Sequence, residues 1–214
     1  MAYANTLGIQ VVVTDHHHRQ EEKVPRGAFS QFHTPKLSGS GVAYMVAHEL
    51  FEHFKQKTPN AKLLDSYFST DYLALATIGT IADLVPLTGA SRSIVTFGLE
   101  AFGKVRRHGI KHLLKEAGID KKPVTPYEIG FVIAPRINAV GRLEDAIDAL
   151  RLLCTTNEDK ARGLAQYVGE TNTSRQDLVK KNVEEALQQV EAMKKLPKLI
   201  ILKSKHWHEG VIGL

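Results

Sequence analysis

Ile9-Gln10-Val11-Val12-Val13-Thr14-Asp15-His16-His17 joins a short β-branched run to three ionisable side chains. A run of this kind predicts a strand buried on both faces, as is typical of a parallel sheet. Residues 2 to 7 are expected to form the last turns of a helix. Parallel neighbours require crossovers of about a dozen residues or more, and almost nothing precedes Ile9. We therefore expect this sheet to lack its N-terminal part.

Downstream of this segment, apolar residues recur at helical spacing, which predicts a largely helical chain. The predicted helices cover residues 41–57, 66–84, 91–105, 110–117, 145–153 and 157–195. Thr125-Pro126-Tyr127-Glu128 adds a helix start, because Thr is a good cap, Pro suits the first helical position and Glu suits the third. The last helix would be about 58 Å long, so it is expected to break near Gly169 or to connect two domains.

A new strand is predicted from Lys198 to Leu202. Together these elements predict an α/β fold class, in which a helix-rich C-terminal part of a parallel-sheet domain leads through a long connecting helix to the start of a second α/β domain. We expect the first domain over residues 1–156, the interdomain helix over 157–196 and the start of a truncated domain over 197–214.

The composition excludes several classes of protein. Hydrophobic residues make up 43% of the 214, which is enough for a packed core and excludes a disordered chain. Cys154 is the single cysteine, so neither an intrachain disulfide nor a cysteine zinc site can form. No apolar run approaches the roughly 18 residues of a membrane span, and the start lacks a signal peptide. We therefore expect a cytoplasmic protein without a membrane partner. The net charge of +5 suits a polyanionic partner or an ordinary basic protein equally well.

Two features are candidates for a metal site. Asp15-His16-His17 follows the predicted strand directly, and ligand sites of open α/β sheets lie at the carboxyl ends of strands. Neutral imidazole binds transition metals, and a neighbouring carboxylate can bind the ion or orient the ring. Asp83 is a lone carboxylate at the end of an apolar helix, where a charge is costly unless it is paired or metal-bound. The alternatives are a solvated polar loop or a tag remnant for the histidines, and a solvent-exposed Asp83.

A third feature is the segment from Ala134 to Leu143, which is expected to be a loop because it contains Pro and Gly. Arg136 and Arg142 offer planar guanidinium groups that bind phosphate through two hydrogen bonds. The alternative is that these arginines form surface ion pairs with Glu144 or Asp145.

Taken together and in order, five segments resemble the DHH phosphoesterase superfamily and, within it, the RecJ single-stranded-DNA exonucleases. These segments cover residues 13–17, 39–43, 79–87, 135–143 and 207–213. The resemblance implies a DHH domain followed by a DHH-associated domain. In this family two aspartate motifs lie upstream of the first segment, and further motifs lie beyond the last. We therefore expect an internal fragment that is inactive by itself.

The resemblance also implies a role for individual residues. The metal ligands would be Asp15, His16 and Asp83. His17 would lie near the metals and the scissile phosphate, and it is assigned as catalytic together with Arg136. The substrate phosphates would be held by Arg136, Asn138 and Arg142, by a helix N-terminus that is itself a natural anion site, and by the start of the DHH-associated domain. These last two groups comprise Ser38, Gly39, Ser40, Gly41 and His208.

For the intact protein, the resemblance implies two-metal hydrolysis of phosphodiesters with Mn²⁺ or Mg²⁺. The substrate would be single-stranded DNA, degraded from 5′ to 3′ during DNA repair and recombination, with a helicase and a single-strand-binding protein as partners. Two alternatives stay open. One is a DHH phosphodiesterase that acts on oligonucleotides or cyclic dinucleotides, and the other is a non-catalytic nucleic-acid-binding relative.

Overall fold

A computed structural model describes residues 1–19, 22, 24–193 and 195–213. The chain forms two compact units. The first comprises Met1–Arg106 and Pro123–Gly130, and the second comprises Arg107–Lys122 and Phe131–Leu214. The expected domain boundaries after residues 156 and 196 stay predictions. Within the described residues, no helix is both long enough and apolar enough to cross a membrane.

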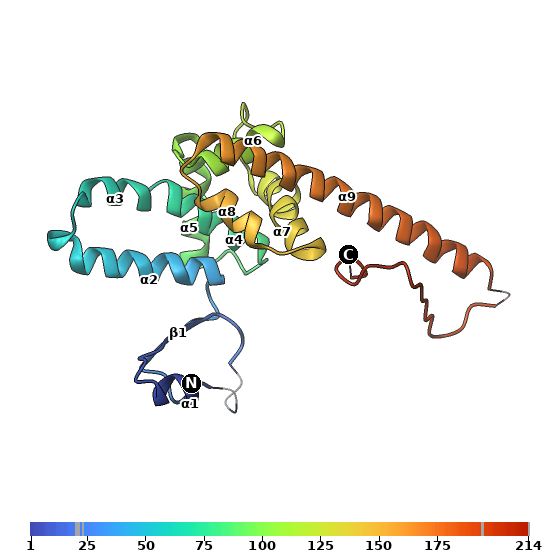
Figure 1. Cartoon of the computed structure of the whole chain (residues 1–214), viewed down its shortest axis with the longest axis horizontal. Coiled ribbons are helices and arrows are strands. Elements are labelled where there is room, and N and C mark those ends of the chain that lie inside the picture. Colours follow the sequence, from blue (N-terminus) through green and yellow to red (C-terminus); the bar gives the residue numbers. More distant parts are fainter. Residues whose placement is uncertain (20–21, 23, 194, 214) are drawn as a thin grey trace. The chain divides into compact units, whose positions relative to one another are not determined.

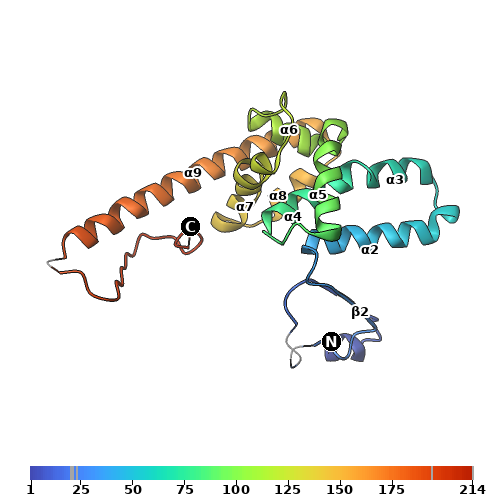
Figure 2. The ribbon, with the colours of Figure 1, turned by 180° about the vertical axis from the view of Figure 1, so that it is seen from behind.

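The first unit begins with a small parallel sheet. Helix α1 (Ala2–Thr6), which confirms the expected helical turn, leads to β1 (Val12–Asp15), and β1 pairs in parallel with β2 (Ser30–His33). Figures 1 and 2 show these elements from opposite sides. The prediction of parallel pairing is confirmed, but the prediction of a strand buried on both faces is wrong. Val12, for example, is 58% exposed. The sheet has two strands in the described part of the chain, so its faces are only partly covered.

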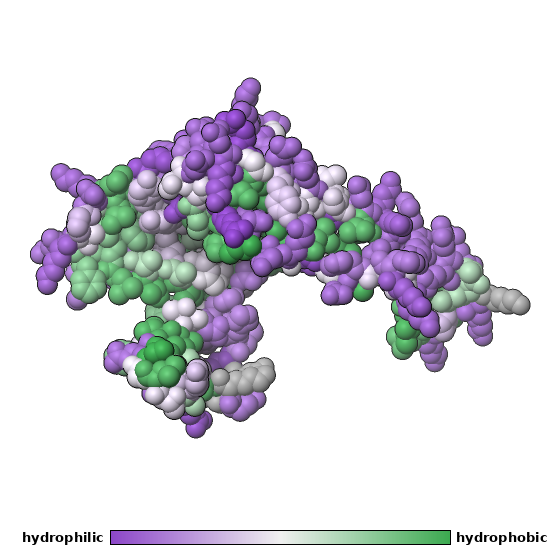
Figure 3. All heavy atoms as spheres, viewed as in Figure 1, coloured by the Kyte–Doolittle hydropathy of each residue, from purple (hydrophilic) through white to green (hydrophobic). Residues whose placement is uncertain are grey.

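The rest of the first unit is a helical layer. It contains α2 (Gly39–Phe54), α3 (Ala61–Phe68), α4 (Asp71–Ala82) and α5 (Gly89–Ala101), with short 3₁₀ turns at Lys55–Lys57 and Phe102–Lys104. Helix α4 packs between α2 and α5. It is apolar on nearly every side, which suits a helix in the core. The core contains Leu37, Val42, Leu73, Ala76 and Ile94. Apolar side chains also gather on the surface over α2 and α3 (Figure 3), among them Leu50, Phe54 and Leu63.

The structure divides the helix expected over residues 66–84 into α3 and α4. The break lies at Ser69 and Thr70, whose hydroxyls both donate to the carbonyl oxygen of Ser66, at 3.2 and 2.7 Å. Such side-chain bonds compete with the helical backbone. Asp71 then starts α4 fully buried, and it accepts hydrogen bonds from the backbone N–H of Arg106 at 2.8 Å and from its Nε at 3.4 Å. The polar junction therefore interrupts a pattern that looks continuous in sequence.

Among its described residues, the second unit has only helices as regular structure. Helices α6 (His108–Glu116), α7 (Ala134–Leu143) and α8 (Ile147–Cys154) all pack on α9 (Glu158–Glu191), whose cap Asn157 accepts from Lys160 N at 2.8 Å. The long helix is confirmed, and it is continuous through Gly169. A Cβ at that position would lie 2.7 Å from Glu116 Oε1. The glycine therefore leaves room for the Glu116 side chain of α6 and does not mark a break.

Three further local predictions have mixed outcomes. The Thr125 helix start is confirmed, because Tyr127 N donates to Thr125 Oγ1 and Thr125 N donates to Glu128 Oε2. It opens a π-helical turn at Glu128–Ile133 that continues into α7. The expected loop at 134–143 is wrong, because these residues form α7, with Pro135 in its first turn directly after the π-helical turn. The strand expected at 198–202 is also wrong. Residues 195–213 are irregular, and a strand needs a paired neighbour that the described residues do not provide.

Candidate metal centre and phosphate-binding helices

His16 lies in the turn that follows β1, against the N-terminus of α2. Its ring packs on Gly39, where a Cβ would lie 3.2 Å from both Cε1 and Nδ1 of the ring. The turn itself is fixed from β2, since His33 Nε2 lies 2.7 Å from the carbonyl oxygen of His17. The His16 side chain is 21% exposed, so one edge of the ring remains open. Packing on a glycine and a hydrogen bond from the neighbouring strand therefore position this imidazole.

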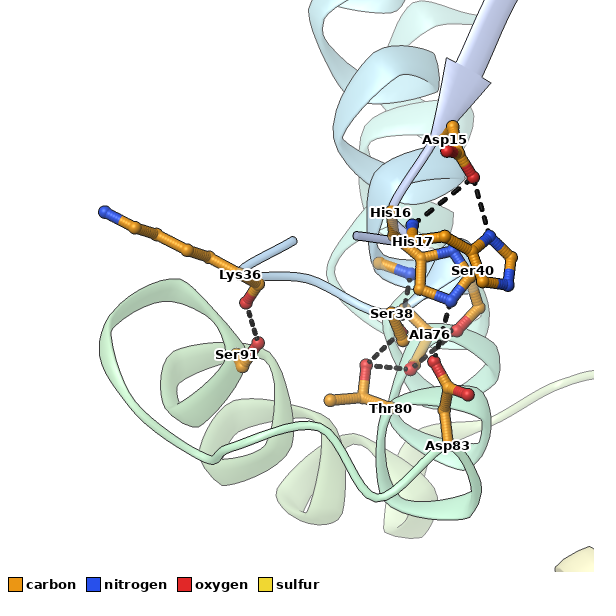
Figure 4. A network of polar contacts seen from close by, with 11 residues as sticks. Asp15, His16, His17, Lys36, Ser38, Ser40, Ala76, Thr80, Asp83 and Ser91 are labelled. Atoms are coloured by element: carbon orange, nitrogen blue, oxygen red, sulfur yellow. Dashed lines mark hydrogen bonds and ion pairs between the residues drawn. The ribbon is translucent and has the colours of Figure 1, made fainter. Parts of the chain in front are cut away.

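Asp83 meets His16 from the other side of the site. It is the C-terminal cap of α4, and its N–H donates to Gly79 O at 3.0 Å. The next residue, Leu84, takes the left-handed conformation with φ 55° and leaves its side chain 87% exposed. For a non-glycine residue this conformation is strained. The result is a contact of 3.0 Å between Asp83 Oδ2 and His16 Nε2, which Figure 4 shows together with the surrounding polar contacts.

Asp15 and His17 form a second pair beside the first. Asp15 Oδ1 lies 2.8 Å from His17 Nδ1 and accepts from the His17 backbone N–H at 3.3 Å. These hydrogen bonds, the side-chain one above all, lower the pKa of the Asp15 carboxyl from 3.8 to about 2. Asp15 is therefore an anion in neutral solution. The His17 side chain is 78% exposed, so its ring is accessible from solvent.

The donor atoms fit a divalent cation. One ligand atom from each of Asp15, His16 and His17 lies within 4.8 Å of the others. That spacing is about twice a typical metal–ligand bond length, so one ion can be shared among these atoms after small side-chain rotations. A mixture of imidazole nitrogen and carboxylate oxygen suits first-row transition metals such as Mn²⁺.

The pKa of Asp15 gives a direct test of the pair. In His17→Ala the side-chain hydrogen bond disappears, so we expect the pKa of Asp15 to rise from about 2 toward 3.8. The depressed pKa favours the folded state above pH 3.8, and that contribution is lost as the pH falls toward 2. The pKa of Asp15 in the wild type and in the variant is measured by following its carboxyl ¹³C chemical shift through an acid titration. An unchanged Asp15 titration in the variant would show that the pair does not exist in solution.

The residues expected to bind anions at the start of α2 are partly used inside the fold. Ser38 Oγ accepts from Gly41 N at 3.0 Å and lies 2.9 Å from Thr80 Oγ1, while Ser40 Oγ donates to Ala76 O at 3.3 Å. These hydroxyls join α2 to α4 next to His16 and Asp83 (Figure 4). Their observed role is to hold the two helices together. Sequence reasoning missed Thr80 and also His33, although the parallel register that places His33 opposite Asp15 would have pointed to it.

The other predicted residues belong to the second unit. Arg136 and Arg142 lie on α7 with Asn138, which is exposed. Arg136 Nη1 donates to Val132 O at 2.9 Å, and its Nε is buried without a partner. The expected alternative, ion pairing with Glu144 or Asp145, is wrong. Glu144 accepts from the Tyr167 hydroxyl, and Asp145 accepts from Ile147 N at 3.0 Å. Among the described residues, neither arginine forms an ion pair.

His208 lies in a turn that packs on α9 and on the end of α7. Its Nδ1 accepts from Gly210 N at 3.0 Å, so a neutral ring carries its proton on Nε2, where it can be donated. The Gly210 carbonyl accepts from Arg142 Nη1 at 3.1 Å. Trp207 Nε1 donates to Glu185 Oε2 of α9 at 3.0 Å. The turn and Arg142 are therefore fixed as one assembly within this unit.

No protein-family model matches the sequence. Among curated proteins, the single-stranded-DNA-specific exonuclease RecJ of Bacillus subtilis is 36% identical over 218 residues, which cover 99% of this chain and 26% of that protein. The RecJ of Escherichia coli is 32% identical, over 99% of this chain and 39% of that protein. The chain therefore spans less than half the length of these relatives.

Solved structures give the same result. The crystal structure of Thermus thermophilus RecJ in complex with Mn²⁺ superposes with a TM-score of 0.78 at 32% identity, over 99% of this chain and 31% of that one. A structure of exonuclease RecJ bound to manganese also gives a TM-score of 0.78, at 34% identity, over 99% of this chain and 52% of that one. In sequence and in fold, nearly the whole chain is similar to a part of these RecJ proteins.

Proposed function

We propose that this chain forms part of the catalytic centre of a RecJ-like exonuclease, which degrades single-stranded DNA from 5′ to 3′ in DNA repair and recombination. The observation that carries the proposal is the 3.0 Å contact between His16 and Asp83. Two segments far apart in sequence each supply a candidate metal ligand, and the fold brings His16 and Asp83 into contact, while His16 also clusters with Asp15 and His17. A solvated histidine loop gives no reason for such convergence.

In this proposal the metal ligands are Asp15, His16 and Asp83, and the ion is Mn²⁺ or Mg²⁺. Related RecJ proteins have been solved with each of these ions. Bound as a pair, such cations supply Lewis-acid activation of a water and neutralise charge on the phosphodiester. The ionised Asp15 accepts a hydrogen bond from His17 Nδ1–H, so that His17 Nε2 would face the scissile phosphate or its attacking water.

The substrate phosphates are assigned to the second unit. Arg136, Arg142 and Asn138 of α7 would bind the DNA backbone together with His208. Support comes from the arginines themselves, because no carboxylate in the described chain neutralises them. Binding through such contacts releases counterions, so affinity should fall with salt. The backbone amides at the start of α2 would add an anion site near His16.

The proposed function also implies protein partners in the cell. Single-stranded DNA must be exposed by unwinding and is coated once exposed, so a helicase and a single-strand-binding protein are the expected partners. We also propose a cytoplasmic location, as expected from the sequence.

A grafting experiment tests the function. The segment of Bacillus subtilis RecJ that aligns with this chain is replaced by these 214 residues, and degradation of long 5′-labelled single strands is followed with Mn²⁺. We expect the graft to degrade single strands and to spare duplexes. The isolated chain is the control. It should show weak metal binding and no robust activity, because its described residues offer few ligands for two ions.

Other outcomes identify the alternatives. Cleavage confined to very short oligonucleotides or cyclic dinucleotides would indicate a different DHH phosphodiesterase. DNA binding by a folded graft that binds no Mn²⁺ in calorimetry would indicate a non-catalytic relative. Strong Mn²⁺-dependent activity from the isolated chain would contradict the proposal that ligands outside these 214 residues complete the metal site.

A further inference from the structure

Arg175 lies on α9, the helix that sequence reasoning treated only as a connection. Its Nη2 donates to Asn172 Oδ1 at 3.1 Å, one turn earlier on the same helix. Its Nε is buried and has no partner. No other hydrogen bond or ion pair of this side chain occurs among the described residues. Most of the N–H donors of this guanidinium are therefore available, although the group is half-buried.

A second guanidinium, that of Arg142, is held near this part of α9. Arg142 Nη1 donates to Gly210 O, and the adjacent Val211 lines a pocket with Val179, one helical turn after Arg175. Burial, and then the positive charge of Arg142, lower the pKa of Arg175. Helix α7, which carries Arg142, packs directly on α9. The carboxylate that follows Arg142 in sequence, Glu144, is engaged by Tyr167. Like charges on neighbouring helices without a counter-ion are unfavourable, so the arrangement is one that an external anion would stabilise.

The surrounding turn holds Arg142 in this position. Arg142 Nη1 donates to Gly210 O at 3.1 Å, and a Cβ at Gly210 would lie only 1.9 Å from the Arg142 carbonyl oxygen. Val211 of the same turn is buried, and with Trp207 it lines a small pocket on α9 formed by Val179, Asn182, Val183 and Ala186. These contacts fix the α7 end and α9 against each other. The two guanidinium groups are thus preorganised and do not need to be ordered by the ligand.

We propose that Arg175 and Arg142 together bind a backbone phosphate of the nucleic-acid strand, which makes α9 part of the substrate-binding surface. The inference rests on the proposed function for the identity of the strand. The chemistry of the site, a pair of guanidinium groups without a counter-ion, requires only a phosphate group.

The test uses the 214-residue chain and three variants. Arg175→Gln removes the charge and keeps much of the length, and Arg175→Lys keeps the charge and loses the planar guanidinium. Arg162→Gln is the matched control, because Arg162 is an exposed arginine on the same helix and is already paired with Asp159. Circular dichroism verifies folding of each. Two probes are used, inorganic pyrophosphate in a thermal-shift assay and fluorescein-labelled oligo(dT) in an anisotropy titration over a range of salt concentrations.

We expect pyrophosphate to raise the unfolding midpoint of the wild type and of Arg162→Gln, and to have little effect on Arg175→Gln. Oligo(dT) affinity should fall roughly tenfold in Arg175→Gln, with a salt slope smaller by about 0.7. Arg175→Lys should be intermediate. Equal behaviour of Arg175→Gln and Arg162→Gln with both probes would overturn the proposal, and so would a wild type that responds to neither. An Arg175-dependent response to pyrophosphate without oligo(dT) binding would uphold the phosphate site while the proposed function failed.

Discussion

In the Bacillus subtilis graft, His16→Ala should lower both the Mn²⁺ affinity and the nuclease rate by about 100-fold or more. Loss of a residue that only orients a ligand typically costs about 10- to 100-fold, and His16 is proposed as a ligand itself. Its Nε2 contacts Asp83 and its ring packs on Gly39. Asp83→Ala should have an effect of the same order, because it removes the partner contributed by α4. Calorimetric titration with Mn²⁺ and single-turnover hydrolysis measure the two quantities.

The matched control is His18→Ala. His18 is an exposed histidine two positions from His16, and it lies outside the cluster of candidate ligands. We expect this variant to keep its metal affinity within about twofold of the parent. Three consecutive histidines can also bind metal as a flexible run. If His18→Ala lost as much affinity as His16→Ala, the run and not the site formed with Asp83 would be the binding element.

In the second unit, Gly109→Ala should destabilise the fold by about 3 kcal/mol and lower the unfolding midpoint by roughly 10 °C. A Cβ at Gly109 would lie 1.9 Å from the Leu152 carbonyl oxygen, where α6 crosses α8. Because the obstructing atom belongs to the backbone, rotation of a side chain cannot relieve the overlap. Thermal unfolding followed by circular dichroism measures the change.

Gly163→Ala should instead increase the stability of the second unit. Gly163 lies in α9 with nothing within 4 Å of an added Cβ. Alanine has a higher helix propensity than glycine, so this variant should gain about 0.5–1 kcal/mol. A stability loss at Gly163, or none at Gly109, would mean that the packing of α6 and α8 on α9 differs in solution.

The sequence predicted correctly those elements that depend on residues close together in the chain, such as a β-branched run or a helix cap. The run at Val11 to Val13 indicated a parallel strand, Asn157 indicated the start of the long helix, and Thr125 indicated a capped start. The break at Ser69 and Thr70 escaped prediction because it depends on where their hydroxyls bond. The strand expected at 198–202 depended on pairing, which a single segment cannot reveal.

The candidate site likewise contains some residues that the sequence predicted and others that it could not predict. Asp15, His16 and Asp83 were named from their motifs, and the fold places both carboxylates near His16, while the roles of all three stay proposals. His33 and Thr80 were missed because their part is set by the register of β2 and by the packing of α4 on α2. Arg175 was missed because nothing near it in sequence distinguishes it from other helical arginines. Its hydrogen-bond partner, Asn172, lies on α9 itself, and Arg142, with which it is proposed to act, comes from α7.

The contact between His16 and Asp83 also bears on the order in which the first unit folds. A peptide containing only β1 and the following turn could bring Asp15 and His17 together, since those two are neighbours in sequence. Asp83 reaches His16 only after the chain has closed a long loop. Closing that loop costs conformational entropy before any stabilising contact forms. A cation that needs both sets of ligands can therefore bind only once α4 has docked on α2. Acquisition of the metal would be a late event and would report on completed folding of the unit.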